Sequence, residues 1–122
     1  MNGFLLVNKE SGLSSNQIVQ KVKNKFSFKK VGHLGTLDPA AEGLLILAIN
    51  RATKFSSYFL NSDKSYFVKV ELGISTNTDD ATGEVIAKSE VQCSSEDVKR
   101  AVNNFLGKSL QKPPYYLSLI HI

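Results

Sequence analysis

The chain has 122 residues, of which 42% are hydrophobic and 21% are charged, and its formal net charge is +4. This length predicts one domain at most, and no apolar run approaches the roughly 20 residues that a membrane-spanning helix needs. A single cysteine, Cys93, excludes an internal disulfide, and with only two histidines beside it a zinc-type ligand cluster is excluded as well. The expected location is therefore the cytoplasm, where thiols stay reduced.

Positive charge is concentrated in the first part of the chain. Residues 1–54 hold eight of the 15 Lys and Arg residues and three of the 11 acidic residues, and five lysines fall between Lys21 and Lys30. Such a distribution indicates a polyanionic partner, nucleic acid first. The alternative is a helix face that carries lysines only because it meets solvent.

The chain begins with an apolar run that predicts a buried strand over residues 3–9. This start lacks the basic segment and the long apolar segment of a signal peptide. Ser14 and Gln17 have the spacing of a capping box, in which each side chain accepts a hydrogen bond from the other residue's backbone. Apolar residues follow at helical spacing, which predicts a helix over 15–26.

The stretch 31–39 has the composition of a loop, with two glycines and the pair Asp38-Pro39. Because Asp38 precedes a proline, its backbone is biased toward an extended conformation. The loop leads into an apolar run that predicts a buried strand over 44–49, and a short helix is expected over 51–61. A carboxylate on a stiffened loop can act as an acid, base or nucleophile, although Asp-Pro is also a common turn pair without any chemistry.

The second part of the chain predicts a hairpin and a helix. Apolar and polar residues alternate over 65–72, which indicates a half-buried strand. A polar loop over 73–83 separates it from a second strand over 84–88, expected to pair with it in antiparallel fashion. Another capping box at Ser94 begins a helix for which Gly107 is the expected stop. The mixture predicts an α+β domain with a mixed or mostly antiparallel sheet flanked by helices.

Several stretches, taken in order, resemble the TruB-type tRNA pseudouridine synthases. The most specific is Gly32-His33-Leu34-Gly35-Thr36-Leu37-Asp38-Pro39 followed by Gly43, which resembles the catalytic motif of that family. The resemblance covers about residues 2–116 and implies a pseudouridine-synthase-like catalytic domain. The other matching stretches are the opening motif over 3–15, the Arg-Ala-Thr-Lys-Phe segment over 51–55, the tyrosine motif over 63–66, the loop over 72–83, and residues 94–107 and 111–116.

The resemblance implies conversion of uridine to pseudouridine at position 55, in the T loop of tRNA, without a metal or an organic cofactor. By resemblance Asp38 is the catalytic carboxylate, either as a nucleophile or as the base that removes a sugar proton. Tyr66, the second catalytic candidate, would stack on the target uracil once that base has left its own stack. From the strand pattern alone, Tyr66 would instead be a core residue, because it shares one face of the predicted strand with Val68 and Val70. The implied partner is the T-arm stem-loop of tRNA, without a membrane or a metal, and the complete protein would be monomeric.

The candidate substrate-binding residues differ in how they would act. His33 resembles the family histidine that helps to hold the rearranged RNA loop, although alone it would fit a structural loop histidine. Lys9 matches a motif lysine with a structural or substrate-positioning role. Lys54, Lys64 and the lysines between Lys21 and Lys30 are candidates for phosphate contacts, which give affinity and salt dependence without sequence specificity. The remaining candidates are Gly35 and Thr36.

Two departures from the family pattern are visible. Glu10 stands where the family usually has a proline, and the match is lost after Tyr116. We therefore expect residues 1–116 to be the N-terminal portion of the catalytic domain, and 117–122 to be a non-family tail on a truncated or misassembled reading frame. The rest of the family's domain normally supplies further strands, a second base-contacting tyrosine and an arginine that pairs with the catalytic aspartate. The alternatives are a catalytically inactive RNA-binding or folding-assisting fragment, and an unstable fragment without a function.

Overall fold

The computed structural model describes residues 1–112, and it divides into two compact units. Unit 1 comprises Met1–Tyr66, and unit 2 begins at Phe67. Length alone predicted one domain, so this division is a finding of the structure. The irregular segment expected over 113–116 and the tail expected over 117–122 lie outside the described residues.

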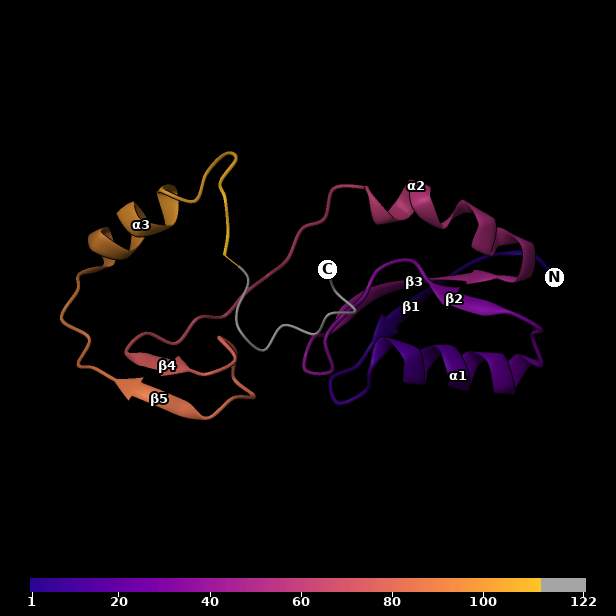
Figure 1. Ribbon diagram of the computed structural model, residues 1–122, viewed down its shortest axis with the longest axis horizontal. Helices are drawn as coiled ribbons and strands as arrows, with labels where there is room; N and C mark the ends of the chain where they lie inside the picture. The colour runs from indigo at the N-terminus through magenta and orange to yellow at the C-terminus, as the bar shows by residue number, and fades with distance from the viewer. Residues whose placement is uncertain (113–122) are drawn as a thin grey trace. The chain divides into compact units, whose positions relative to one another are not determined.

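Unit 1 is built on a three-stranded antiparallel sheet (Figure 1). Its strands are β1 (Gly3–Lys9), β2 (Val31–His33) and β3 (Gly43–Ile49), in the order β1-β3-β2. Because both faces of the sheet are covered at β3, this strand is apolar without alternation, and four of its seven residues are buried. The two strands predicted at the positions of β1 and β3 are confirmed, whereas β2 lies in a stretch predicted to be a loop.

One face of this sheet is covered by α1 (Ser15–Phe26), which matches the predicted helix. The capping box is present: the Gln17 N–H donates to Ser14 Oγ at 3.2 Å, and the Ser14 N–H donates to Gln17 Oε1 at 2.8 Å. The apolar side of α1 packs on the central strand and forms the larger core of the unit. The buried residues of that core are Ile18, Val19, Leu45 and Leu47.

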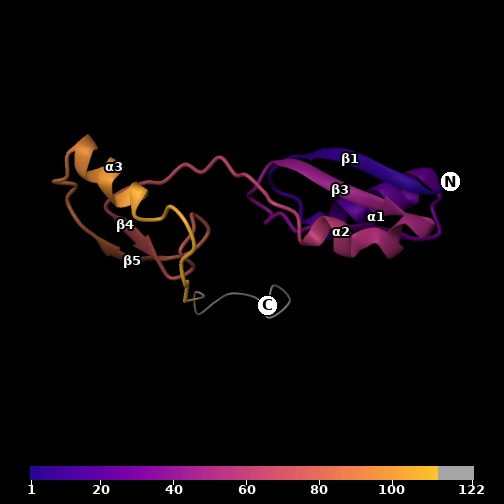
Figure 2. The same cartoon turned by 90° about the horizontal axis from the view of Figure 1, so that it is seen from above.

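The other face of the sheet carries two short helical segments (Figures 1 and 2). These are the 3-10 helix η1 (Asn50–Phe55) and α2 (Ser56–Leu60), which together replace the single helix expected over 51–61. Phe59 packs on Phe4 of β1 with a ring separation of 4.8 Å. The buried residues of this second, smaller core are Leu34, Ala48 and Ala52.

Unit 2 consists of a hairpin and a helix. The hairpin strands are β4 (Ile74–Thr76) and β5 (Val85–Lys88), and the helix is α3 (Ser95–Asn103). The capping box predicted at Ser94 is present, because Asp97 supplies both of its partner contacts. The helix ends at Asn103, four residues before the expected stop. Both sheets are antiparallel, so the predicted α+β character is confirmed.

The strand predicted over 65–72 is wrong for the described part of the chain. Residues 65–71 have no regular structure, and β5, its expected partner, pairs instead with β4 inside the stretch predicted to be a loop. A strand needs a neighbour to satisfy its backbone groups, and closing the shorter loop between β4 and β5 costs less chain entropy. Tyr66 and Val70 are consequently 65% and 72% exposed rather than half-buried.

The turn between β4 and β5 is organised around Asp80. One oxygen of its carboxylate, Oδ1, accepts hydrogen bonds from the Thr82 N–H at 2.8 Å, the Thr82 hydroxyl at 2.6 Å and the Thr78 hydroxyl at 2.8 Å. Gly83 closes the turn, and a Cβ at this position would overlap the side chains of Thr78 and Asn77. The turn therefore depends on an ionised carboxylate and on a glycine.

We expect acid to loosen this turn. The hydrogen bond from the Thr82 side chain, followed by that from Thr78, holds the pKa of Asp80 below its ordinary value of 3.8. A depressed pKa means that the stabilisation is fully present above pH 3.8 and is lost as the pH falls through the folded-state pKa. Carbon-13 titration of the Asp80 carboxyl measures its pKa, and amide exchange in β4 and β5 over the same pH range measures the loosening of the turn. A midpoint above 3.8 would contradict the expectation.

Candidate functional site

The loop between β2 and β3 presents Asp38 at the surface of unit 1. Leu34 anchors the start of this loop, because its side chain is buried and its N–H donates to the Ile46 carbonyl at 2.8 Å. Asp38 itself is exposed, and its carbonyl accepts from the Ala41 N–H at 3.0 Å, which closes a turn. Among residues 1–112 the Asp38 carboxylate has no hydrogen-bond or ion-pair partner. The main chain of the loop is fixed while its acid group meets solvent.

The residue before Asp38 is held by a side chain of α1. Ser15 is buried, and its hydroxyl donates to the Leu37 carbonyl at 2.9 Å. The same oxygen accepts from the Leu37 N–H, also at 2.9 Å. Sequence reasoning did not single out Ser15. The only available signal was its place in the opening motif, and nothing in that motif shows which backbone groups the hydroxyl would meet.

The residue after Asp38 is held by a buried lysine. Lys9, at the end of β1, is fully buried, and its Nζ donates to the carbonyls of Glu10 at 3.0 Å, Leu13 at 2.6 Å and Pro39 at 3.2 Å. The Pro39 carbonyl also accepts from the Gly12 N–H at 2.8 Å. An ammonium has three N–H donors, so each donor of Lys9 has a carbonyl partner. This geometry gives Lys9 a structural task and leaves no donor for a ligand.

His33 and Gly35 shape the first turn of the loop. The His33 Nδ1 donates to the Gly35 carbonyl at 2.8 Å, because a carbonyl can only accept. Gly35 has φ +138°, a conformation that residues with a Cβ rarely adopt. A Cβ built on Gly35 would lie 3.9 Å from Cε of Lys64, so the stem of that lysine passes beside the loop. The structure thus brings together three of the candidate substrate-binding residues.

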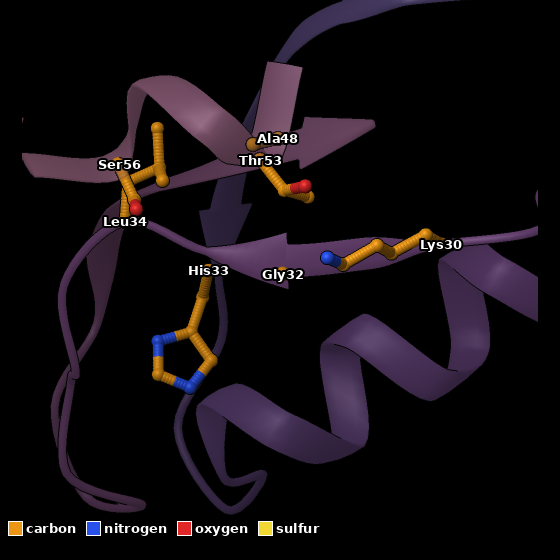
Figure 3. A pocket seen from close by; sticks show the side chains of 7 residues that line it. All are labelled: Lys30, Gly32, His33, Leu34, Ala48, Thr53 and Ser56. Atoms are coloured by element: carbon orange, nitrogen blue, oxygen red, sulfur yellow. The ribbon is translucent and has the colours of Figure 1, made fainter. Parts of the chain in front are cut away.

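A cavity of about 180 Å³ lies beside β2, on the side of η1 and α2 (Figure 3). The His33 ring points away from Thr53 and Ser56, and Lys30 lies along the strand. Asp38 does not line this cavity. The cavity is therefore separate from the carboxylate, and the candidate site is the exposed loop. The lining residues are Lys30, Gly32, His33, Leu34, Ala48, Thr53 and Ser56.

Within residues 1–112, none of the side chains of Thr36, Lys54, Lys64 and Tyr66 makes a hydrogen bond or an ion pair with Asp38. Thr36 is exposed on the same loop, and Lys54 is exposed at the end of η1. Lys64 is exposed too, and its Nζ donates to the carbonyls at the end of α2 and in the following turn. Tyr66, at the last position of unit 1, makes no hydrogen bond or ring contact within residues 1–112. Within residues 1–112, no hydrogen bond, ion pair or ring contact joins Asp38 to Tyr66.

Residues 1–112 offer neither a metal-binding cluster nor a membrane-spanning helix. No group of three or more His, Cys, Asp or Glu side chains within residues 1–112 is placed to hold a metal ion. No helix in the same range has the length and apolar character needed to cross a membrane.

Unit 1 is an α+β unit that displays the exposed Asp38 carboxylate on a loop whose neighbouring backbone groups are anchored. The family model described as "TruB family pseudouridylate synthase (N terminal domain)" matches residues 23–121. This match covers most of the chain, and the chain therefore belongs to the TruB family of pseudouridylate synthases.

Individual relatives agree with this assignment. The chain is 50% identical over 119 residues to the tRNA pseudouridine synthase B of Blochmanniella floridana, a match that covers 98% of this chain and 47% of the relative. It is 46% identical over 121 residues to the protein of the same name from Colwellia psychrerythraea, with 99% and 38% covered. The corresponding protein of Acholeplasma laidlawii is 46% identical over 119 residues, with 98% and 43% covered. The chain spans less than half the length of these relatives.

Proposed function

We propose that this chain carries the catalytic aspartate of a tRNA pseudouridine synthase that acts on uridine 55 in the T loop, and that unit 1 is part of a pseudouridine-synthase-like fold. The observation that carries the proposal is the anchored loop. Backbone contacts fix the residues before and after Asp38, while its carboxylate is exposed and unpartnered within residues 1–112. A fixed main chain with an exposed carboxylate suits a catalytic group that must contact a bound substrate in one orientation. The names of the relatives support tRNA as that substrate.

The proposed reaction is an isomerisation: the product contains the same atoms as the substrate, and no co-reactant is needed. The bond between N1 of uracil and C1′ of ribose breaks, the detached base rotates, and C5 joins C1′. The proton on C5 leaves to solvent, and N1 gains a proton. In this scheme Asp38 acts as the nucleophile or as the base that removes a sugar proton, and Tyr66 stacks on the uracil after it has flipped out.

We assign the other candidates to substrate positioning. His33 would contact the rearranged RNA loop beside Gly35 and Thr36, and Lys54 and Lys64 would contact phosphates. The structure favours an indirect role for Lys9, because all three of its donors are occupied by carbonyls. We therefore propose that Lys9 supports the loop of Asp38 and does not touch RNA.

A specific observation favours a second candidate function, RNA binding without turnover. The chain spans less than half of its relatives, and within residues 1–112 no hydrogen bond or ring contact joins Tyr66 to the loop of Asp38. In this second function, catalysis requires the part of the relatives beyond the match. The basic first part of the chain would still bind RNA through phosphates.

One experiment separates the two candidates. The chain is incubated with a tRNA T-arm stem-loop that carries tritium at C5 of uridine, and the tritium released to water is counted. Release above that of RNA alone is the expected result, because C5 loses its hydrogen during the reaction. Folded protein that binds the stem-loop without releasing tritium would overturn turnover by this chain and favour the RNA-binding role.

A further inference from the structure

Ser15 is a buried hydroxyl whose partners lie next to the candidate catalytic carboxylate. It is the first residue of α1, its exposed fraction is 2%, and its two partners belong to Leu37, which is 22 residues away in the sequence. The hydroxyl donates to the Leu37 carbonyl and accepts from the Leu37 N–H, both at 2.9 Å. One side chain therefore satisfies both backbone groups of Leu37, as a neighbouring strand would do.

This contact acts directly on the backbone of Asp38. The Leu37 carbonyl belongs to the planar peptide group that joins Leu37 to Asp38. Its orientation therefore fixes the positions of the Asp38 nitrogen and Cα. On the far side, the Pro39 carbonyl is held by Lys9 and by the Gly12 N–H. Asp38 thus lies between two anchored peptide groups. Its position before a proline further restricts the φ and ψ angles that its backbone can adopt.

Burial makes the hydroxyl hard to replace. Water that could take over the two hydrogen bonds has almost no access at 2% exposure. A hydroxyl can donate and accept at once, whereas an alanine methyl can do neither. Without the hydroxyl, the N–H and carbonyl of Leu37 must find other partners, and the loop must shift to reach them.

We infer that Ser15 is a positioning residue for the Asp38 carboxylate and that it acts through both backbone groups of Leu37. The inference rests on the proposed catalytic role of Asp38 but concerns a different residue. Ser15 orients the carboxylate and does not touch the RNA. Loss of its hydroxyl therefore lowers the rate of the chemical step and leaves the affinity for RNA unchanged.

The neighbouring serine provides a matched control. Ser14 Oγ accepts from the Gln17 N–H and caps α1, but within residues 1–112 it makes no hydrogen bond to the loop. Ser14→Ala therefore removes the same hydroxyl from the adjacent position and weakens the same helix. It should lower the melting temperature by a few degrees and leave kcat within about twofold, since no backbone group of the loop loses a partner.

The test compares Ser15→Ala, Ser15→Cys and Ser14→Ala in the full chain, with the tritiated T-arm stem-loop as substrate. Ser15→Ala should lower kcat by about 30- to 100-fold with KM within about twofold, as expected for a misplaced catalytic group. The thiol of Ser15→Cys is a weak donor and acceptor of similar size, so the kcat of this variant should lie between those of the wild type and Ser15→Ala. An unchanged kcat for Ser15→Ala, or a loss as large in Ser14→Ala, would overturn the inference.

A second readout needs no turnover. In Ser15→Ala the Leu37 amide should exchange with solvent at least about tenfold faster, and the nitrogen-15 order parameter of Asp38 should fall below that of the wild type. If the wild-type chain releases no tritium, the proposal that this chain turns over its substrate is overturned. The exchange rate and the order parameter still test whether Ser15 positions Asp38. If Ser15→Ala leaves the Asp38 order parameter and the Leu37 exchange rate unchanged, the inference fails whatever the activity.

Discussion

Replacing Asp38 by asparagine is expected to abolish tritium release from the T-arm stem-loop, with a loss of about 10⁴-fold or more in rate. Losses of this size are typical when a group that forms or breaks bonds is removed. Asparagine has nearly the shape of aspartate, but its amide is neither a base nor an effective nucleophile. The measurement is the single-turnover rate of tritium release at saturating protein.

The same substitution should leave folding and RNA binding nearly intact. The Asp38 side chain is exposed and has no partner within residues 1–112, and the contacts that hold its loop come from backbone groups. Removing one negative charge should change the dissociation constant for RNA by no more than a few-fold. Loss of binding together with activity would count against a purely chemical role for Asp38.

A second carboxylate on the same loop offers a control for charge. Glu42 is exposed and lies four residues after Asp38. Glu42→Gln makes the same change from carboxylate to amide, and we expect it to leave tritium release within about twofold, because no bond is proposed to form at Glu42. An equal loss in both variants would mean that local charge, and not the particular carboxylate, controls the rate.

Elements whose signals lie within one segment could be predicted from the sequence. The capping boxes at Ser14 and Ser94 each involve residues three positions apart, and both are present in the structure. The continuous apolar run of β3 likewise predicted a buried strand before any partner was known. The exposed loop position of Asp38 follows from its glycines and its proline.

Features that depend on a distant partner could not be predicted. The stretch 65–72 has the alternation of a strand, but alternation does not say which segment will pair with it. The anchors of the loop are hidden for the same reason, since Lys9 meets Pro39 across 30 positions and Ser15 meets Leu37 across 22. Lysines are also rarely fully buried, so nothing in the sequence alone showed that Lys9 would be buried.

Two lysines with similar hydrogen bonds allow the effect of burial on stability to be measured directly. Lys9 Nζ donates to three carbonyls and is fully buried. Lys64 Nζ also lies within hydrogen-bond distance of three carbonyls, those of Phe59, Leu60 and Ser62, but its side chain is exposed. We expect Lys9→Met to destabilise unit 1 strongly and Lys64→Met to have little effect.

The expected difference follows from what replaces the ammonium. At Lys9 the three carbonyls lose charge-assisted hydrogen bonds, each worth about 1.5–3 kcal/mol, in a place that water scarcely reaches. Part of this loss is offset because the charge no longer has to be buried, which leaves about 3 kcal/mol. At Lys64 water takes over the carbonyls, so the cost is about 0.5 kcal/mol, the effect of a cation near a helix C-terminus. Methionine keeps most of the lysine stem, so neither change creates a large cavity.

Denaturant titration read by a probe inside unit 1 measures both costs, since the two units need not unfold together. The Leu47 amide, in the centre of the sheet, is a suitable probe for native-state hydrogen exchange. Equal losses in the two variants, or a loss below about 1 kcal/mol for Lys9→Met, would show that the buried ammonium adds little beyond its packing. A loss near 3 kcal/mol for Lys9→Met alone would mean that the loop of Asp38 and the core of unit 1 are stabilised by one side chain. Lys9 would then act on the site through stability, without contacting RNA.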